Sequence, residues 1–286
     1  MITYDRNGIK IGDYVNYSPD EKEQGYLLLT KYSGYEDEQL INQDKNMKWQ
    51  VLRIYEDNSI DLIGTAENSA STIGLCGALG YNNGVYLLDD ICKNLYSKGD
   101  IIARSIDLAD MEYWMSQSIN GINARNSYIF TDTNTKYSES KQYIGNATYR
   151  PDIYEEAEDE NDPYYITPTE ETYKPKNANP DDTLTTQQTY YEIEINSENY
   201  NDAAKVLFSN EWYWVASRCI RCDSTRAYFG LRYANSGIHG NGLFFSDTGE
   251  GRTKGRVRPI VHIEPYIEIT PCIGDNNIDN MHKINL

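Results

Sequence analysis

Cys219 and Cys222 are the closest pair of thiols in the chain and could bind a metal or exchange electrons. A zinc site needs a second such pair or two suitably spaced histidines, whereas His239, His262 and His282 are isolated from one another. A redox pair opens a helix beside a βαβ unit, but these two cysteines follow a strand-like run. We therefore expect structural cysteines, with metal binding and redox activity as the alternatives.

Hydrolytic and calcium-dependent chemistry have no motif in the chain. A hydrolase needs a nucleophile beside a base, yet no such motif surrounds any of the three histidines, and no carboxylate spacing marks a general acid and base. The acidic run at 155–160 lacks the spacing of a calcium loop, and the tripeptides Glu-Pro-Asn, Gln-Pro-Asp and Trp-Asn-Asp of calcium-dependent lectins are absent. The sequence predicts a protein that is not an enzyme and has no cofactor or metal.

The segment from Trp212 to Ile263 carries many polar side chains on a sparse apolar skeleton. In an extended strand successive side chains point to opposite faces, so we expect Phe229 and Leu231 to face the core. The alternate residues are then expected to form an exposed face: Tyr228, Gly230 and Arg232. This pattern predicts a framework that carries a ligand-binding surface, in which Tyr, Arg and Asn contact the ligand directly.

Charge and composition favour an interaction protein. Residues 218–258 contain eight basic and three acidic side chains, whereas the whole chain has a net charge of −18. Nucleic-acid binding is disfavoured, because the overall negative field repels a polyanion at long range. The 26 tyrosines offer large contact area with few rotamers to immobilise, as in recognition surfaces. A tyrosine-rich β-protein without such a surface is the plain alternative.

The first part of the chain predicts the elements of an α+β core. Two strands, at 49–55 and 60–63, flank the turn residues Asp57 and Asn58. A helix should follow Asn82-Asn83 and stop near Gly99, with an apolar stripe at helical spacing formed by Val85, Leu88, Ile91, Cys92 and Leu95. A second helix should begin at the N-cap Asp107, with Asp110 three residues on and a stripe of Leu108, Met111, Met115 and Ile119.

Four regions organise the chain. Residues 1–127 form the first part of the domain, 128–199 an acidic, Tyr-rich surface insertion, 200–268 the second part with the binding region, and 269–286 a tail. Between 150 and 200 there are fourteen acidic and three basic residues, too polar for a core of their own. The alternation from Tyr190 to Ile195 would form a strand if the insertion orders against the rest of the protein. Pro259 suggests an edge or irregular position in the last strand, because proline lacks an amide donor.

Three C-terminal motifs resemble variable proteins of diversity-generating retroelements, found in phages and bacteria of gut communities: Trp214–Arg218, Phe229–Arg232 and Gly255–Val261. Three upstream motifs are similar to those of prophage-associated relatives: Ile11–Val15, Ile60–Ile63 and Gly80–Asp89. The resemblance covers residues 8 to about 125 and 205–263, and leaves out the insertion and the tail. It implies an α+β fold of the C-type-lectin type, as in formylglycine-generating enzymes.

In that family a reverse transcriptase mutates the adenines of a template repeat, so codons for asparagine come to encode many residues. The resemblance implies that exposed positions here are diversified and bind the ligand. The residues expected there are all reachable from an adenine-adenine-pyrimidine codon: Cys219, Arg221, Asp223, Arg226, Tyr228, Gly230, Tyr233, Asn235, Ser236, His239, Asn241, Phe245 and Asp247. Glu250 and Lys254 are not reachable in this way and are expected to belong to the framework.

The predicted function is therefore the display of a hypervariable surface that recognises a protein or glycan on a bacterial cell, as a phage receptor-binding protein or a displayed protein. Relatives suggest a homotrimer. A sulfatase-modifying oxidase of the formylglycine-generating type and a static binding module remain alternatives. No secretory leader opens the chain and no stretch is long enough to span a membrane, so we expect synthesis in the cytoplasm, with a phage tail tip or a cell surface as the final location.

Overall fold

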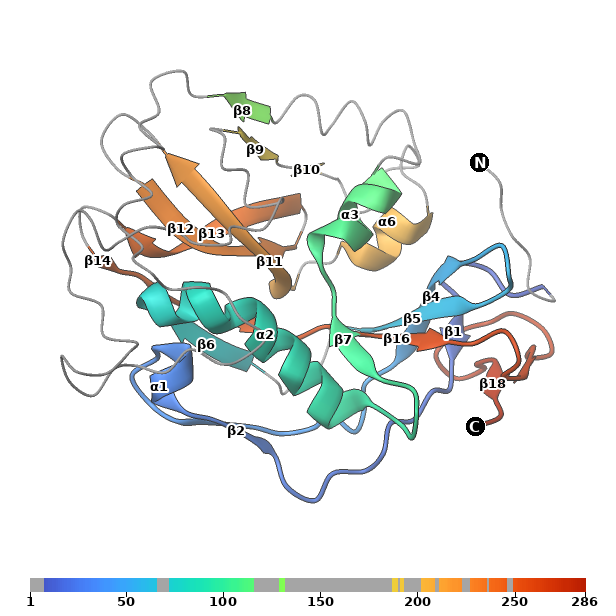
Figure 1. Cartoon of the computed structure of the whole chain (residues 1–286). Coiled ribbons are helices and arrows are strands. Elements are labelled where there is room, and N and C mark those ends of the chain that lie inside the picture. Colours follow the sequence, from blue (N-terminus) through green and yellow to red (C-terminus); the bar gives the residue numbers. More distant parts are fainter. Residues whose placement is uncertain are drawn as a thin grey trace.

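The computed structural model describes residues 8–65, 72–115, 129–131, 187–189, 191–192, 202–208, 211–222, 227–235, 237–245 and 249–286. They form an α+β protein with two main sheets and several separate helices (Figure 1). The longest helix, α2 (Gly77–Tyr96), runs from the larger sheet to the smaller one. The predicted α+β class is confirmed.

The smaller main sheet has five antiparallel strands in the order β1-β4-β5-β16-β7. Its members are β1 (Tyr14–Val15), β4 (Trp49–Ile54), β5 (Ile60–Gly64), β16 (Pro259–Ile263) and β7 (Ala103–Ser105). The predicted hairpin is confirmed, because β4 pairs with β5 around a turn in which Asn58 takes a positive φ of 67°. Pro259 was expected at an edge or an irregular position, and the edge is excluded because β16 lies between β5 and β7; proline is tolerated there as the first residue of the strand.

The larger sheet has seven strands along the path β10-β13-β12-β11-β15-β6, with β14 paired to β13. They are β10 (Tyr191–Glu192), β13 (Gly237–Phe245), β12 (Ala227–Ala234), β11 (Tyr213–Cys222), β15 (Arg252–Arg256), β6 (Thr72–Cys76) and β14 (Gly249–Glu250). We call the antiparallel strands β11, β12 and β13 the ribbon. The strand β10 comes from the insertion, within the run predicted to alternate, and pairs with the ribbon at Ile238 and Gly237.

The remaining strands form three short pairs. These are β2 (Tyr26–Leu28) with β3 (Gln39–Ile41), β8 (Ile129–Thr131) with β9 (Gln187–Thr189), and β17 (Ile269–Thr270) with β18 (Lys283–Ile284). The last pair lies in the predicted tail. His282 bridges to Val15 of β1, and its Nε2 lies 2.9 Å from the Asp13 carboxylate. The tail is therefore attached to the first strand of the domain.

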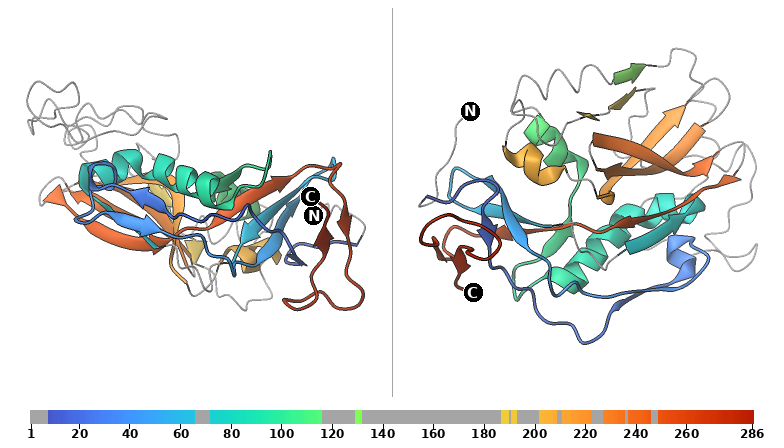
Figure 2. Two further views of the ribbon diagram at one scale, coloured as in Figure 1. Left: turned by 90° about the horizontal axis from the view of Figure 1, so that it is seen from below. Right: turned by 180° about the vertical axis from the view of Figure 1, so that it is seen from behind.

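The helix α2 packs on one face of the larger sheet (Figures 1 and 2). Its predicted apolar stripe from Val85 to Leu95 is confirmed as buried. The helix begins earlier than expected, at Gly77, so that Asn82 and Asn83 lie buried within it. The first turns carry no apolar stripe because they pack through glycine: a Cβ atom on Gly84 would lie 2.3 Å from Cδ1 of Leu231.

Two shorter helices lie against each other, α3 (Leu108–Met115) and α6 (Asp202–Leu207), and a four-residue helix, α1 (Thr30–Ser33), contacts α2. The predicted start of α3 is confirmed, because the amide of Asp110 donates to Oδ1 of Asp107 at 2.9 Å. Leu108 and Met111 of its stripe are buried, whereas Ile119 lies outside the described residues. Within the described part of the chain, no helix is long and apolar enough to cross a membrane.

Candidate ligand-binding surface

The residues that open β11 and those of the strand β15 hold each other in place. A Cβ atom on Gly255 of β15 would lie 1.7 Å from Cζ3 of Trp212, so the indole packs directly on the glycine backbone. The amide of Arg256 donates to the carbonyl of Trp212, and its guanidinium pairs with Glu211 at 2.6 Å. The start of β11 and the strand β15 therefore form one tightly packed unit.

Arg258 continues this framework inside the core. Its side chain is buried and donates to three backbone carbonyls, those of Gly64 at 2.8 Å, Leu207 at 2.6 Å and Val206 at 2.7 Å. The guanidinium also lies over the ring of Tyr213, 5.0 Å from its centroid. One side chain thereby joins the five-stranded sheet, α6 and the first residue of β11.

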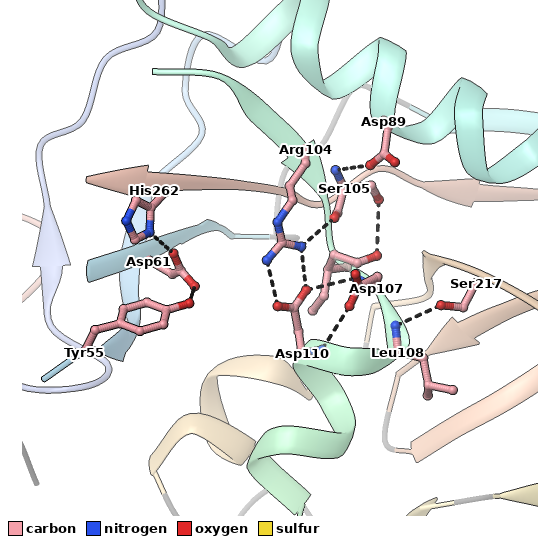
Figure 3. Close-up of polar contacts among 11 residues, drawn as sticks. Tyr55, Asp61, Asp89, Arg104, Ser105, Asp107, Leu108, Asp110, Ser217 and His262 are labelled. Atoms are coloured by element: carbon pink, nitrogen blue, oxygen red, sulfur yellow. Dashed lines mark hydrogen bonds and ion pairs between the residues drawn. The ribbon is translucent and has the colours of Figure 1, made fainter. Parts of the chain in front are cut away.

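A polar junction at β7 fixes the other side of β11 (Figure 3). The amide of Ala216 donates to the carbonyl of Ile106 at 2.7 Å, and the amide of Leu108 donates to the Ser217 hydroxyl at 2.9 Å. The amide of Ser105 donates to the Asp89 carboxylate of α2 at 2.8 Å. We call these contacts, with Arg104, Asp107 and Asp110, the junction. They connect both main sheets to α2 and α3.

Charges in the junction are arranged around the N-terminus of α3. The Arg104 guanidinium binds Asp110 through two 2.7 Å hydrogen bonds. Burial, followed by the nearby Asp110 carboxylate, raises the pKa of Asp107 from 3.8 to about 6. Burial likewise raises the pKa of Asp89. The folded state therefore retains protons on this cluster at mildly acidic pH.

A second polar group lies on the five-stranded sheet, where Asp61 accepts two hydrogen bonds. The Tyr55 hydroxyl donates to Oδ2 at 2.6 Å, and His262 Nδ1 lies 2.8 Å from Oδ1 (Figure 3). The hydrogen bond to Asp61 raises the pKa of His262 above 6.5. An Asp–His pair of this kind could serve a base, but no nucleophile in the described part of the chain is recorded in hydrogen-bonding contact with His262.

The basic count of residues 218–258 does not represent surface charge. Arg218, Arg232 and Arg258 are buried, at 0%, 1% and 2% exposure. Arg232 was expected on the exposed face, and this expectation was wrong because its side chain is buried. The Arg218 guanidinium lies 5.2 Å from the centroid of the Tyr81 ring on α2, so this arginine packs in the protein interior. Composition alone could not distinguish such residues from display residues.

Two of the residues assigned to the variable surface belong to the framework instead. A Cβ atom on Gly230 would lie 1.7 Å from the carbonyl oxygen of Asn241, so no other side chain fits there without moving the backbone of β13. Cys219 faces Gly230 across the strand pair and is buried, at 4% exposure. A diversified position must accept many side chains, and these two positions do not.

The strand register divides the remaining residues between two faces. Arg221 pairs with Tyr228, and Tyr228 with Phe245, so their backbone positions share the face of Gly230. Tyr233 lies on the opposite face, because it is an odd number of residues from Tyr228 along the strand. Tyr228 and Phe245 were assigned to the binding surface together with Tyr233, but their backbone positions do not share its face.

Tyr233 belongs to a row of stacked rings. Its centroid lies 4.7 Å from that of Trp212 and 5.1 Å from that of His239, which it faces across the strand pair. Trp212 in turn contacts the buried Trp214 at 4.7 Å. Trp212 was assigned to the framework from the sequence, and its role in this row was missed. The signal was available in the cross-strand pairing of Tyr233 with His239, but only once the register is known.

Five of the assigned residues have described, partly exposed side chains. They are Tyr233, Asn235, His239, Asn241 and Phe245. The Phe245 ring occupies the space that side chains would need at Gly242 and Gly251, where added Cβ atoms would lie 2.7 Å and 2.5 Å from it. Because Phe245 lies on the face of Gly230 and not on that of Tyr233, we call the other four residues the candidate surface.

The other assigned residues cannot be placed in the same way. Only the backbone of Arg221 and Tyr228 is described, and four positions lie outside the described residues: Asp223, Arg226, Ser236 and Asp247. The two residues expected in the framework have exposed side chains near β6. Glu250 lies beside the Cys76 thiol at 3.8 Å, and Lys254 lies over the Tyr35 ring at 4.8 Å.

Metal and redox chemistry find little support at this surface. Among the residues that the structure describes, no three His, Cys, Asp or Glu side chains are grouped to hold a metal ion. Cys219 is buried, and the side chain of Cys222 lies outside the described set. The arrangement offers aromatic stacking and amide hydrogen bonds, which are suited to recognition.

Comparison with known proteins adds no relative: no family model, no curated protein and no solved structure matches this chain.

Proposed function

We propose that the ribbon is a recognition element on a C-type-lectin-like scaffold, and that the protein binds a protein or glycan ligand on a bacterial surface without catalysis. The proposal follows the resemblance to variable proteins of diversity-generating retroelements. The protein would lie at a phage tail tip or on a cell surface. Several copies there, as in a trimer, would increase the apparent affinity by avidity.

One observation carries the proposal: the ends of the ribbon are locked by buried contacts, while the middle of β13 is partly exposed. Trp212 on Gly255, Arg258 on three carbonyls, and Ser217 on α3 hold the backbone without using the candidate surface. None of these three contacts involves the side chain of His239 or Asn241, so substitutions there leave all three in place. A rigid support with replaceable side chains is the arrangement that a diversified binding site needs.

The ring row favours ligands that stack. Tyr233 and His239 are partly exposed and stack beside Trp212, and Asn241 lies two positions from His239 on the same strand. Aromatic side chains surrounded by amides contribute much of the binding energy in recognition surfaces, because few rotamers are immobilised. Sugar rings and aromatic or aliphatic protein side chains are the ligand chemistries that fit this row.

The binding test uses fluorescently labelled protein and a panel of gut bacterial cells. Wild-type protein should bind at least one strain, and the double variant His239→Ala/Asn241→Ala should lose about tenfold or more in apparent affinity, as expected for a hot spot. The matched control is Tyr266→Ala, which removes a tyrosine that is 81% exposed on a different part of the chain. Equal binding by both variants would contradict the proposal.

A genomic comparison tests diversification separately from binding. A neighbouring reverse transcriptase gene and a near-identical template repeat are expected, with adenine mismatches in the codons of the candidate surface. The codons of Gly230, Cys219 and Gly255 should match the template, because the packing at these positions rejects other side chains. A template that varies Gly230 freely would refute this assignment, and the absence of any template would leave a static binding module.

A further inference from the structure

Arg53 on β4 lies against two tyrosine rings outside the ribbon, and we call these three side chains the clamp. Its guanidinium carbon lies 4.1 Å from the centroid of Tyr55 and 3.7 Å from that of Tyr113 on α3. All three side chains are partly exposed. Both rings therefore lie within cation–π distance of the guanidinium, whose N–H groups point outward in its own plane.

The edge of Arg53 has no acceptor among the described residues. Its Nε is buried without a hydrogen-bond partner, and no hydrogen bond or ion pair of this side chain occurs in the described part of the chain. Ring faces attract a cation but cannot accept five in-plane N–H bonds. A buried donor left in this condition costs free energy that an acceptor would recover.

The neighbouring carboxylate is already committed to other donors. Asp61 lies opposite Arg53 in the strand register, but its two oxygens accept from the Tyr55 hydroxyl at 2.6 Å and pair with His262 Nδ1 at 2.8 Å. The same contact holds the Tyr55 ring in position against Arg53. Asp61 therefore holds the Tyr55 ring of the clamp in position but forms no ion pair with Arg53.

We propose that Arg53, Tyr55 and Tyr113 form a binding site for an oxyanion, a carboxylate or phosphate group of a ligand, held by the edge of the guanidinium. A planar guanidinium binds such groups through two parallel hydrogen bonds, which a lysine cannot reproduce. The clamp removes the rotamer freedom that a free arginine would lose on binding. This site lies outside the ribbon and does not depend on the proposed function of that surface.

The test follows the Arg53 Nε–H signal by NMR during titration with acetate and with inorganic phosphate, at constant ionic strength balanced with chloride. The signal is assigned from its absence in Arg53→Lys. We expect it to shift saturably while the other arginine signals stay in place, and the stronger of the two titrants identifies the class of oxyanion. No shift with either anion, or equal shifts at all arginines, would overturn the site.

A second variant tests the clamp itself. Tyr113→Leu keeps Arg53 and an apolar residue on α3 but removes one ring face, and it should weaken anion binding severalfold with an unchanged fold by circular dichroism. The matched control is Arg256→Lys, which changes a partly exposed arginine that is paired with Glu211. Anion binding that is unaffected by Tyr113→Leu, or lost equally in Arg256→Lys, would show that the two rings do not build the site.

Discussion

The junction and the candidate surface are both rich in polar residues, but they differ in what those residues contact and in how exposed they are. In the junction, Arg104, Asp110 and Ser217 each bond to a named partner on another element. In the middle of β13, His239 and Asn241 are partly exposed and lie between glycines. The comparison teaches that polar composition does not identify a binding surface. What matters is whether the polar groups hold the fold or face the solvent.

The largest expected effect comes from placing a side chain at a framework position, as a diversified surface position would require. Gly230→Val should destabilise the protein by about 4 kcal/mol or more, because the new side chain collides with the β13 backbone rather than with a movable side chain. Urea unfolding followed by circular dichroism measures the change. Asn241→Val, at the residue whose carbonyl is approached, is the control and should cost far less. Equal losses would mean that β13 tolerates side chains at both positions.

Arg258 tests whether a buried arginine in the basic segment serves the fold. Arg258→Met keeps the length of the side chain but leaves the carbonyls of Gly64, Val206 and Leu207 without their donor, at an expected cost of about 3 kcal/mol. The control, Arg252→Met, removes an exposed arginine paired with Glu36 and should change the stability far less, because an exposed ion pair contributes little. If the thermal midpoints of the two variants agree, Arg258 belongs with the display residues after all.

The sequence predicts local elements better than the roles of polar residues. The stripe from Val85 to Leu95 and the cap at Asp107 depend on spacing within one element, and both were correct. The early start of α2 was missed because glycine packing leaves no apolar signal. The burial of Arg258 could not be read from the sequence, since its partners at Gly64 and Val206 are distant along the chain.

The candidate surface was only partly predictable, because its geometry also depends on strands that are distant along the chain. Alternation correctly put Phe229 and Leu231 in the core, but it also implies that Tyr233 shares their face rather than that of Tyr228. The collision that excludes side chains at Gly230 arises from the neighbouring strand. Strand register decides such points, and it depends on pairing between segments that periodicity treats separately.

A smaller effect is expected from the pH dependence of the junction. The pKa of Asp107 is about 6 in the folded protein and 3.8 in the unfolded chain, so the folded state binds more protons between these values. This part of the stability is present below pH 3.8 and is lost as the pH rises through about 6. Asp107→Asn keeps the cap, because its Oδ1 still accepts from the Asp110 amide.

The Asn variant should therefore be more stable than wild type at pH 8, by about 1 kcal/mol after allowance for solvent screening. The difference should shrink as the pH is lowered toward 4, and thermal unfolding across this range measures it. Asp100→Asn, at an exposed aspartate, should leave the pH profile unchanged. If wild type were instead the more stable protein at pH 8, the charge of Asp107 would stabilise the junction, and the expected pH dependence would be wrong.

The smallest expected effect on stability comes from the candidate surface itself. His239→Ala/Asn241→Ala should change the free energy of unfolding by less than about 1 kcal/mol, because both side chains are partly exposed and the contacts that hold the ribbon lie at its ends. Tyr233→Ala should lower the free energy of unfolding by more than His239→Ala or Asn241→Ala does alone, since the Tyr233 ring contacts both Trp212 and His239. Urea unfolding of the three single variants tests this order. A large loss from Asn241→Ala would move the middle of β13 from the display class to the framework and remove the main support for recognition by the ribbon.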